Sequence, residues 1–320
     1  MAMLRSTARL SMLWVGLAAV VGCGSEDVES PGILNRRLAS LADARQRVKT
    51  RLMVQQPSPE PYESEVPEGV EVITYESEGR RLMAWLLRPS RKEGATKEGP
   101  APAVLYAHAG FALARGDLET ARPFADAGYV VLLPSWRGEN GNPGNFEMYY
   151  GEVADAQAAL EHLAGLPGVD RTRLFAVGHD TGGTIVMLLA MMTNRLRAAA
   201  ACGGIPDMRA IVQEQKKPAF QMMPFDWRDP LELDLRSPAR HLRDLKCPLY
   251  LFYGERQDQL YYAQAAAMEV LAPNLGKIVR VVQLPGTDHN TAIDAAVPRI
   301  LRYFQWHLDD DRRSAPPAAY

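Results

Sequence analysis

The sequence has little of what would link a protein to metals, cofactors or nucleic acids. Its three cysteines and six histidines match no metal-binding spacing, so no metal site is expected. The formal net charge is only −2 and no long run of one sign occurs, so no nucleic-acid partner is expected either. No internal repeat is present, and no cofactor is expected.

Hydrophobic runs long enough to cross a membrane are also missing. The apolar stretch at residues 10–21 has twelve residues, too few for a spanning helix. It follows two arginines and ends in the letters VVGC, which resembles the lipobox of bacterial lipoproteins. The resemblance implies that residues 1–22 are a signal peptide and that Cys23 carries lipid chains, an ordinary signal peptide being the alternative. Gly24 favours the outer membrane, so we expect a lipid-anchored protein of the bacterial cell envelope that faces the periplasm.

Residues 23–66 are predicted to form a lipid-anchored tether. Residues 24–32 are rich in acidic and small side chains, and residues 33–53 have apolar residues at loosely helical spacing among many arginines. Prolines punctuate residues 57–67. Such a composition is typical of a solvated spacer with a transient helix.

A regular pattern predicts one domain over residues 67–310. Short apolar runs between turn residues predict strands at 70–74, 82–87, 103–107, 129–133, 174–177, 198–202, 249–253 and 278–284. Apolar residues at helical spacing predict helices at 118–127, 152–164, 184–192, 261–271 and 293–306. The alternation predicts an α/β fold with a doubly wound, mostly parallel sheet that begins with an antiparallel hairpin. Residues 203–246 are read as a short irregular cap-like insertion, and residues 311–320 as a C-terminal tail.

Two cysteines besides Cys23 lie at the ends of predicted strands. Cys202 and Cys247 lie at opposite ends of neighbouring parallel strands, which are about 17 Å long for five residues. That separation is too large for a disulfide, so both are expected to be small buried residues of the core.

The most informative motif is Gly178-His179-Asp180-Thr181-Gly182-Gly183, which follows a predicted strand and precedes a predicted helix. Its pattern is that of a nucleophile elbow, Gly-x-Ser-x-Gly, with Asp180 in the nucleophile position. Gly178 and Gly182 are expected because any side chain there would collide with the neighbouring strand or helix.

Two further candidates stand in loops at the carboxyl ends of later strands. Asp258 follows the strand ending at residue 253, and His289 lies in the loop after the last strand. Nucleophile, acid and histidine in this chain order are typical of an α/β-hydrolase triad, so Asp180, Asp258 and His289 are the candidate catalytic residues. The neighbouring carboxylates Glu255 and Asp288 leave the choice of acid open. The other five histidines are expected to be structural.

Backbone N–H groups near the elbow are expected to form an oxyanion hole. The N–H of Thr181 lies at a helix N-terminus, where it can donate to an oxyanion. A second donor is expected from the loop after the first buried strand, with Ala109 and Gly110 as the candidates.

Residues 82–308 resemble an α/β-hydrolase catalytic domain of the prolyl-oligopeptidase and acylaminoacyl-peptidase type, with dienelactone hydrolases as close relatives. The similarity rests on VLYAHAGF, FADAGYVVLLPSWRGENGNPGNF, GVDRTRLFAVGHDTGGT and PLYLFYGERQDQL, followed by LPGTDH. It implies hydrolysis of peptide, amide or ester bonds in a small-molecule substrate. The chain departs from the family at two positions: Asp180 replaces the serine, and Gln257 stands where the family has its acid, one residue before Asp258.

The aspartate leaves several mechanisms open. A carboxylate that attacks an ester or amide forms a mixed anhydride, whereas attack on an sp³ carbon forms an ordinary ester that water activated by His289 could hydrolyse. GHDTGG resembles the GHDWGG of epoxide hydrolases, which share the fold and the aspartate elbow with haloalkane dehalogenases. Asp180 as a general base for water and a binding lipoprotein without catalysis are the other possibilities.

The resemblance to epoxide hydrolases is incomplete. Thr181 replaces their tryptophan, and the cap-like insertion contains no tyrosine that could protonate a leaving oxygen. Four tyrosines elsewhere could substitute, although the sequence does not place them near the elbow: Tyr149, Tyr150, Tyr261 and Tyr262.

Overall fold

The structure, a computed structural model, describes residues 40–62, 65–89, 99–214, 223–257 and 259–309. Several predicted features lie outside the described residues: the signal peptide at 1–22, Cys23, Asp258 and the tail at 311–320. No helix in the described part is long and apolar enough to cross a membrane.

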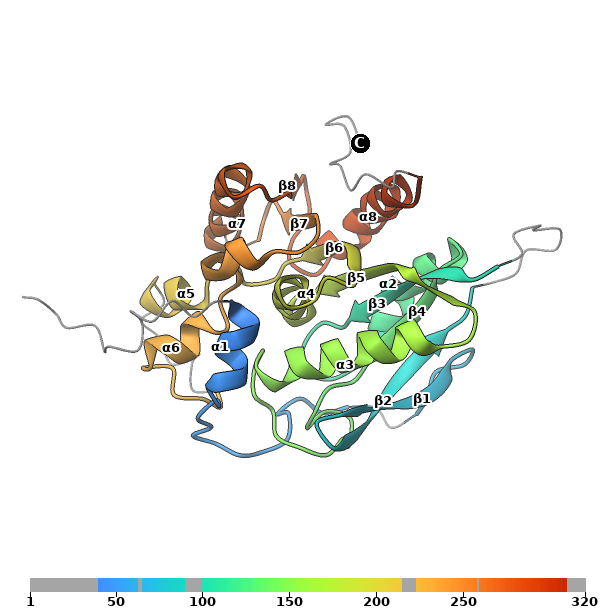
Figure 1. Cartoon of the computed structure of the whole chain (residues 1–320), viewed down its shortest axis with the longest axis horizontal. Helices are drawn as coiled ribbons and strands as arrows, with labels where there is room; N and C mark the ends of the chain where they lie inside the picture. Colours follow the sequence, from blue (N-terminus) through green and yellow to red (C-terminus); the bar gives the residue numbers. More distant parts are fainter. Residues whose placement is uncertain (1–39, 63–64, 90–98, 215–222, 258, 310–320) are drawn as a thin grey trace, which may run out of the picture. The chain divides into compact units, whose positions relative to one another are not determined.

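A sheet of eight strands forms the centre of the domain (Figure 1). In chain order the strands are β1 (Glu71–Ser77), β2 (Arg80–Leu87), β3 (Ala101–Ala107), β4 (Val130–Pro134), β5 (Val169–His179), β6 (Leu196–Cys202), β7 (Leu249–Gly254) and β8 (Val279–Leu284). Their order across the sheet is β1-β2-β4-β3-β5-β6-β7-β8. Only β1–β2 and β2–β4 pair antiparallel, which confirms the predicted hairpin and mostly parallel sheet.

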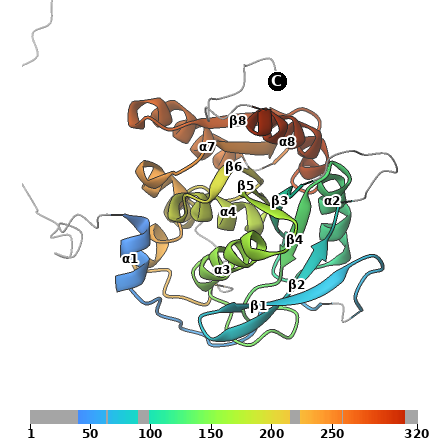
Figure 2. The ribbon, with the colours of Figure 1, turned by 45° about the vertical axis from the view of Figure 1, so that its right-hand side comes forward.

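Helices cover both faces of this sheet (Figure 2). They are α1 (Leu41–Arg47), α2 (Arg115–Asp126), α3 (Gly151–Gly165), α4 (Thr181–Met192), α5 (Met208–Glu214), α6 (Pro230–Asp234), α7 (Gln259–Leu271) and α8 (Ala292–Asp309), with short 3₁₀ segments at Pro238–Asp244 and Ala272–Leu275. Because side chains alternate along a strand, Val104 and Tyr106 of β3 face the core under α2 and α8, whereas Leu105 and Ala107 face α3 and α4. The two cores together bury both faces of the parallel strands.

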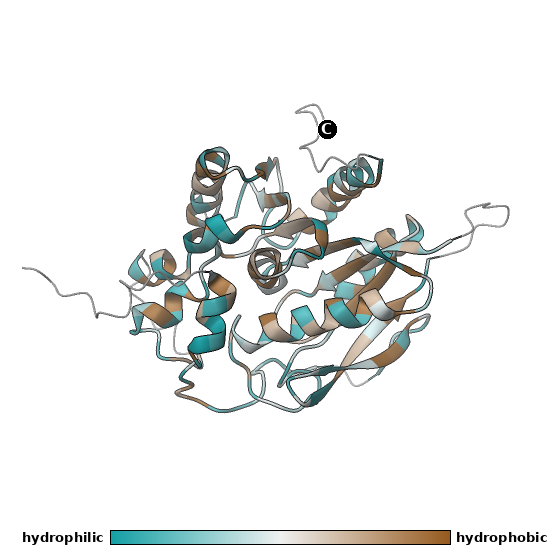
Figure 3. Ribbon diagram, in the orientation of Figure 1, coloured by the Kyte–Doolittle hydropathy of each residue, from teal (hydrophilic) through white to brown (hydrophobic). Residues whose placement is uncertain are grey.

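Helix α4 lies deepest in the molecule. It is apolar around its whole circumference, as expected of a helix without a solvent face (Figure 3), and every residue from Thr181 to Met191 is buried. Ala199 and Ala201 of β6 belong to the same core as α4, and such small side chains let a helix lie close to its sheet. This packing fixes the start of α4 at the end of β5.

The predicted cysteine positions are confirmed. Cys202 is the last residue of β6, and Cys247 precedes β7, the neighbouring parallel strand. Both are buried thiols and form no disulfide, as predicted.

The prediction of a solvated spacer is wrong for residues 40–62. The Ser40 hydroxyl caps α1 by accepting from the Asp43 N–H at 3.1 Å, and Leu41 and Ala44 are 0% and 1% exposed. A β-bridge joins Leu52 to Phe225 of the cap-like insertion. Composition concealed this docking because only one short helical face is apolar, and the other apolar residues are scattered among charged residues, glutamines and prolines.

We expect Leu41→Ala to lower the free energy of unfolding by about 2–4 kcal/mol, since it removes a fully buried side chain. Met53→Ala in the same segment is the matched control: its side chain is 55% exposed, and the change should stay within about 0.5 kcal/mol. Urea unfolding of both variants measures the difference. Equal, small effects would mean that α1 does not stabilise the domain.

Candidate active site

Asp180 occupies a sharp turn between β5 and α4. Its φ of 52° and ψ of −115° are uncommon for a residue with a side chain. A Cβ added to Gly178 would lie 2.1 Å from the Gly182 carbonyl oxygen, and one added to Gly182 would lie 2.1 Å from that of Ala107. Both positions therefore require glycine, as the motif predicted, because α4 approaches β5 and β3 to backbone contact.

The two carboxylate oxygens of Asp180 have different partners. Oδ1 lies 3.1 Å from Nε2 of His289, and Oδ2 accepts from the Gly110 N–H at 3.1 Å. Burial alone would raise the pKa of Asp180, but the hydrogen bond and charge of His289 and the Gly110 N–H outweigh it and hold the pKa below its usual range. The elbow therefore carries a negative charge at neutral pH.

Gln257 determines which nitrogen of His289 carries the proton. The Gln257 Oε1 accepts from the Gly254 N–H at 3.2 Å, and Nε2 donates to the Gly203 carbonyl at 3.3 Å. These backbone contacts turn the amide N–H₂ toward Nδ1 of His289, at 3.0 Å, so Nδ1 is an acceptor. The proton of the neutral imidazole then resides on Nε2, which donates to Asp180.

This hydrogen-bond direction is the reverse of that in a serine triad. There a carboxylate accepts from Nδ1–H, and Nε2 is left to accept the proton of the nucleophile. Here the hydrogen bond and charge of Asp180 raise the pKa of His289, with burial acting against them, while the Gln257 amide opposes a proton on Nδ1. The role of Asp258 remains a prediction, and the described partner of Nδ1 is Gln257.

The N–H groups predicted as oxyanion donors point in different directions. Gly110 directs its N–H at Asp180, but the Ala109 N–H donates to Asp117 Oδ1 at 2.9 Å and so faces away from the elbow, contrary to prediction. The Thr181 hydroxyl donates to the Gly110 carbonyl, which orients that peptide. The Thr181 N–H, at the start of α4, has no acceptor among the described residues.

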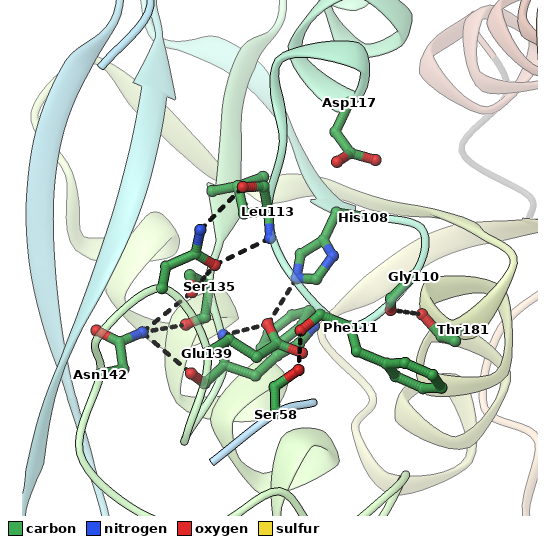
Figure 4. A network of polar contacts seen from close by, with 12 residues as sticks. Ser58, His108, Gly110, Phe111, Leu113, Asp117, Ser135, Glu139, Asn142 and Thr181 are labelled. Atoms are coloured by element: carbon green, nitrogen blue, oxygen red, sulfur yellow. Dashed lines mark hydrogen bonds and ion pairs between the residues drawn. The ribbon is translucent and has the colours of Figure 1, made fainter. Parts of the chain in front are cut away.

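A buried ion pair supports residues 108–111, the loop in which the oxyanion donors were predicted and which is called the oxyanion loop below (Figure 4). His108 is 0% exposed, with Nε2 2.9 Å from Glu139 Oε2 and Nδ1 2.9 Å from the Ala109 carbonyl. Since both neighbours are acceptors, both nitrogens donate and the ring is an imidazolium. Burial would lower the pKa of His108, but Glu139 raises it to about 9. His108 is structural, as expected, but it is also charged.

The N-terminal segment runs along the outside of the same loop, which sequence reasoning missed. The Ser58 hydroxyl donates to the Phe111 carbonyl, and the Glu60 carboxylate accepts from the Phe111 N–H at 2.5 Å (Figure 4 shows the Ser58 contact). The two carboxylates of Glu60 and Asp180 thus flank Gly110. Across the described ranges, no group of three or more histidine, cysteine, aspartate or glutamate side chains could hold a metal ion.

Of the four candidate tyrosines, Tyr149 lies close enough to the elbow for the charge of Asp180 to act on its phenol. Tyr149 is 3% exposed and belongs to the same core as Ile185 of α4. Burial, followed by the charges of Asp180 and Tyr261, raises the pKa of Tyr149 well above its usual value, so it remains a phenol. Tyr150 instead donates to the backbone of α1, through the Arg45 carbonyl at 3.0 Å.

The sheet order, the elbow and the histidine after the last strand define an α/β-hydrolase. Within that class, residues 117–311 match the Prolyl oligopeptidase family. The match covers more than half of the chain, and the chain belongs to this family.

Similar sequences include two bacterial proteins. An uncharacterized peptidase of Bacillus subtilis, YuxL, is 26% identical over 243 residues, which are 70% of this chain and 36% of YuxL. An uncharacterized protein of Mycobacterium tuberculosis is 35% identical over 227 residues, which are 71% of this chain and 74% of that protein. The chain thus spans little more than a third of YuxL but most of the mycobacterial relative.

Solved structures of low sequence identity share the fold. A puromycin hydrolase has a TM-score of 0.66 at 17% identity, over 77% of this chain and 40% of its own. Pyrococcus horikoshii acylaminoacyl peptidase has a TM-score of 0.61 at 18% identity, over 77% of this chain and 42% of its own. A Klebsiella pneumoniae protein described as a dienelactone hydrolase has a TM-score of 0.56 at 20% identity, over 74% of this chain and 98% of its own.

The His108–Glu139 pair predicts a pH dependence of stability. The pKa of His108 is about 9 in the folded chain and 6.5 as a free side chain, so its stabilising contribution is complete below about pH 6.5 and is lost as the pH rises through 9. The shift corresponds to at most about 3 kcal/mol. Urea unfolding across this window should show a decline that His108→Gln, which keeps a donor toward Glu139, removes. Parallel profiles for both proteins would mean that His108 is neutral.

The Gln257 contact predicts the proton position on His289. In Gln257→Glu a carboxylate replaces the amide donor while Asp180 still accepts from Nε2, so Nδ1 should gain a proton and the ring should become an imidazolium. Nitrogen-15 NMR of labelled histidine distinguishes the two ring nitrogens, with His289→Ala assigning the signals. An Nδ1-protonated ring already present in the wild type would contradict the assignment.

Proposed function

We propose that this family member is a hydrolase in which Asp180 is a covalent nucleophile toward an electrophilic sp³ carbon that carries a leaving group, such as an epoxide carbon or an alkyl halide. The observation that carries this proposal is that the two carboxylate oxygens of Asp180 have different hydrogen-bond partners. Oδ2 rests on the Gly110 N–H, where an oxyanion is stabilised in this fold, and Oδ1 faces His289.

Serine-type acyl transfer fits this arrangement poorly. That reaction needs two oxyanion donors for the carbonyl oxygen of the substrate. Of the predicted donors only the Thr181 N–H has no acceptor among the described residues. The other two are already engaged, because Gly110 donates to Asp180 and Ala109 to Asp117. Attack by the carboxylate on an ester or amide would also give a high-energy mixed anhydride. The peptidase chemistry in the names of the relatives supports hydrolysis as the reaction class, whereas the site favours a different electrophile.

In the first step, Oδ1 of Asp180 attacks the carbon, and the bond to the leaving group breaks with its electron pair. A halide departs without a proton, whereas an epoxide oxygen takes the phenol proton of Tyr149. The negative charge of Asp180 helps to keep that proton on Tyr149. Because ester formation removes this charge, the phenol becomes a better donor as the leaving oxygen develops charge.

In the second step, water attacks Cγ of Asp180 and gives its proton to Nε2 of His289. The negative charge then develops on Oδ2, which already faces the Gly110 N–H. Collapse breaks the Cγ–Oδ1 bond, the alcohol leaves with Oδ1 and the proton from His289, and the new carboxylate contains one oxygen from water.

Gln257 makes this second step slow. To accept a proton at Nε2, the neutral imidazole must carry its own proton on Nδ1. The Gln257 amide N–H₂ also points at Nδ1, so two donors would face each other there, and this tautomer is unfavourable. The alkyl-enzyme ester is therefore expected to accumulate after a rapid first step. The same contact favours a second candidate function, a small-molecule binding protein without turnover.

The remaining sequence-based proposals concern location. The letters VVGC support a lipid anchor at Cys23, and with it attachment to a membrane of the bacterial cell envelope. The proposed substrate is a small molecule that reaches the elbow from the periplasm.

A single turnover in ¹⁸O-water tests covalent catalysis. We expect an epoxide or haloalkane to esterify Asp180, and after hydrolysis the label should appear in the Asp180 carboxylate, located by peptide mass spectrometry, and not in the first product. Asp180→Asn should abolish esterification, and His289→Ala should retain the ester but block its hydrolysis. Label found only in the product would exclude the nucleophile. A bound, unchanged ligand would instead support the binding protein.

A further inference from the structure

The turn that contains Tyr149 has an unfavourable backbone. Met148 and Tyr149 are consecutive residues with φ of 50° and 68°, in the left-handed region that side chains disfavour. Such a conformation persists only where the surroundings hold it. Its contacts therefore determine where the Tyr149 ring lies.

Two arginines bind every carbonyl of this turn. Arg236 donates from Nε to the carbonyl of residue 148 at 2.7 Å and from Nη2 to that of residue 147 at 2.9 Å. Arg45 donates from Nη2 to the carbonyls of residues 149 and 150, at 2.6 and 2.8 Å. Charged donors make stronger hydrogen bonds than neutral ones, so these contacts favour the left-handed conformation directly.

A buried carboxylate binds the N–H side of the same turn. Glu152 is 1% exposed, and its Oε1 accepts from the N–H groups of residues 147 and 148, at 2.6 and 3.1 Å. Carbonyls and N–H groups are thus both held by ionisable side chains, of which Arg236 and Glu152 are buried and Arg45 is half-buried.

The two arginines come from segments far from the elbow in sequence. Arg45 belongs to α1, in the segment predicted to be a tether. Arg236 follows α6, is 0% exposed, pairs with Glu232 at 2.6 Å and lies 3.8 Å over the ring of Phe225. Thr50, also in the N-terminal segment, accepts from Arg236 Nη2 at 2.7 Å. This hydrogen bond connects the N-terminal segment to Arg236.

We infer that Arg45 is a positioning residue of the active site, through which helix α1 of the N-terminal segment places Tyr149 beside Asp180. The segment between the predicted lipid anchor and the sheet would then be required for the site, in addition to any role in attachment. The task of Tyr149 as proton donor rests on the proposed function, whereas its placement by Arg45 does not.

The placement is tested without any substrate. In fluorotyrosine-labelled protein, the fluorine-19 NMR resonance of Tyr149 is assigned by its absence from Tyr149→Phe. We expect Arg45→Met to shift or broaden this resonance and Arg45→Lys, which keeps a charged donor, to restore it in part. Arg47→Met is the matched control, because Arg47 lies on the exposed side of the same helix and should leave the resonance unchanged. If Arg45→Met does not fold, Arg45→Gln must still shift the resonance.

A kinetic measurement then addresses the role of Tyr149. Esterification of Asp180 by an epoxide should fall about 10- to 100-fold in Arg45→Met, and esterification by a haloalkane, which needs no proton, should fall less. An unmoved Tyr149 resonance in a folded Arg45→Met or Arg45→Gln protein would overturn the inference. A moved resonance in a protein that never esterifies Asp180 would leave the inference standing and reject the proposed function.

Discussion

The backbone contact between the first turn of α4 and strands β5 and β3 is the constraint on which the site depends. It leaves no room for a side chain at Gly178 or Gly182 and forces Asp180, which lies between them, to adopt a positive φ. The Asp180 N–H is held by the Cys202 carbonyl at 2.8 Å. The Asp180 side chain is thereby directed at Gly110 and His289. The oxyanion loop and the histidine loop are arranged around that one carboxylate.

The site has one carboxylate next to the histidine, as a serine triad does, but the carboxylate is at the nucleophile position instead of the acid position. A serine triad has a neutral nucleophile and a carboxylate at the acid position, and the histidine lies between them. Here Asp180 is the carboxylate and Gln257 the neutral partner, so His289 still has one anion and one neutral neighbour. The geometry of the three positions survives because the hydrogen bonds persist with donors and acceptors exchanged. The proposed chemistry differs from that of a serine triad because the Gly110 N–H binds an oxygen of the protein itself.

Ionic groups, all of them buried except the half-buried Arg45, support the site on two sides. His108 and Glu139 lie behind the oxyanion loop, and Arg45 and Arg236 bind the turn of Tyr149. Buried charges are costly to desolvate, and a hydrogen-bonded pair often contributes more to a defined conformation than to stability. In both places the charged group binds backbone carbonyls or lies beside them, so what it fixes is the path of a loop.

The sequence by itself determined the fold, the elbow and the pairing of Asp180 with His289. Hydrophobic periodicity, strand-end glycines and chain order are local signals, and a parallel sheet brings its strand ends to one edge. Only the tertiary structure decided that Gln257 controls the proton of His289 and that Arg45 belongs to the site. These contacts join loops and helices that are distant in sequence and carry no periodic pattern. Their partners are set by side-chain direction and burial, which a linear sequence does not encode position by position.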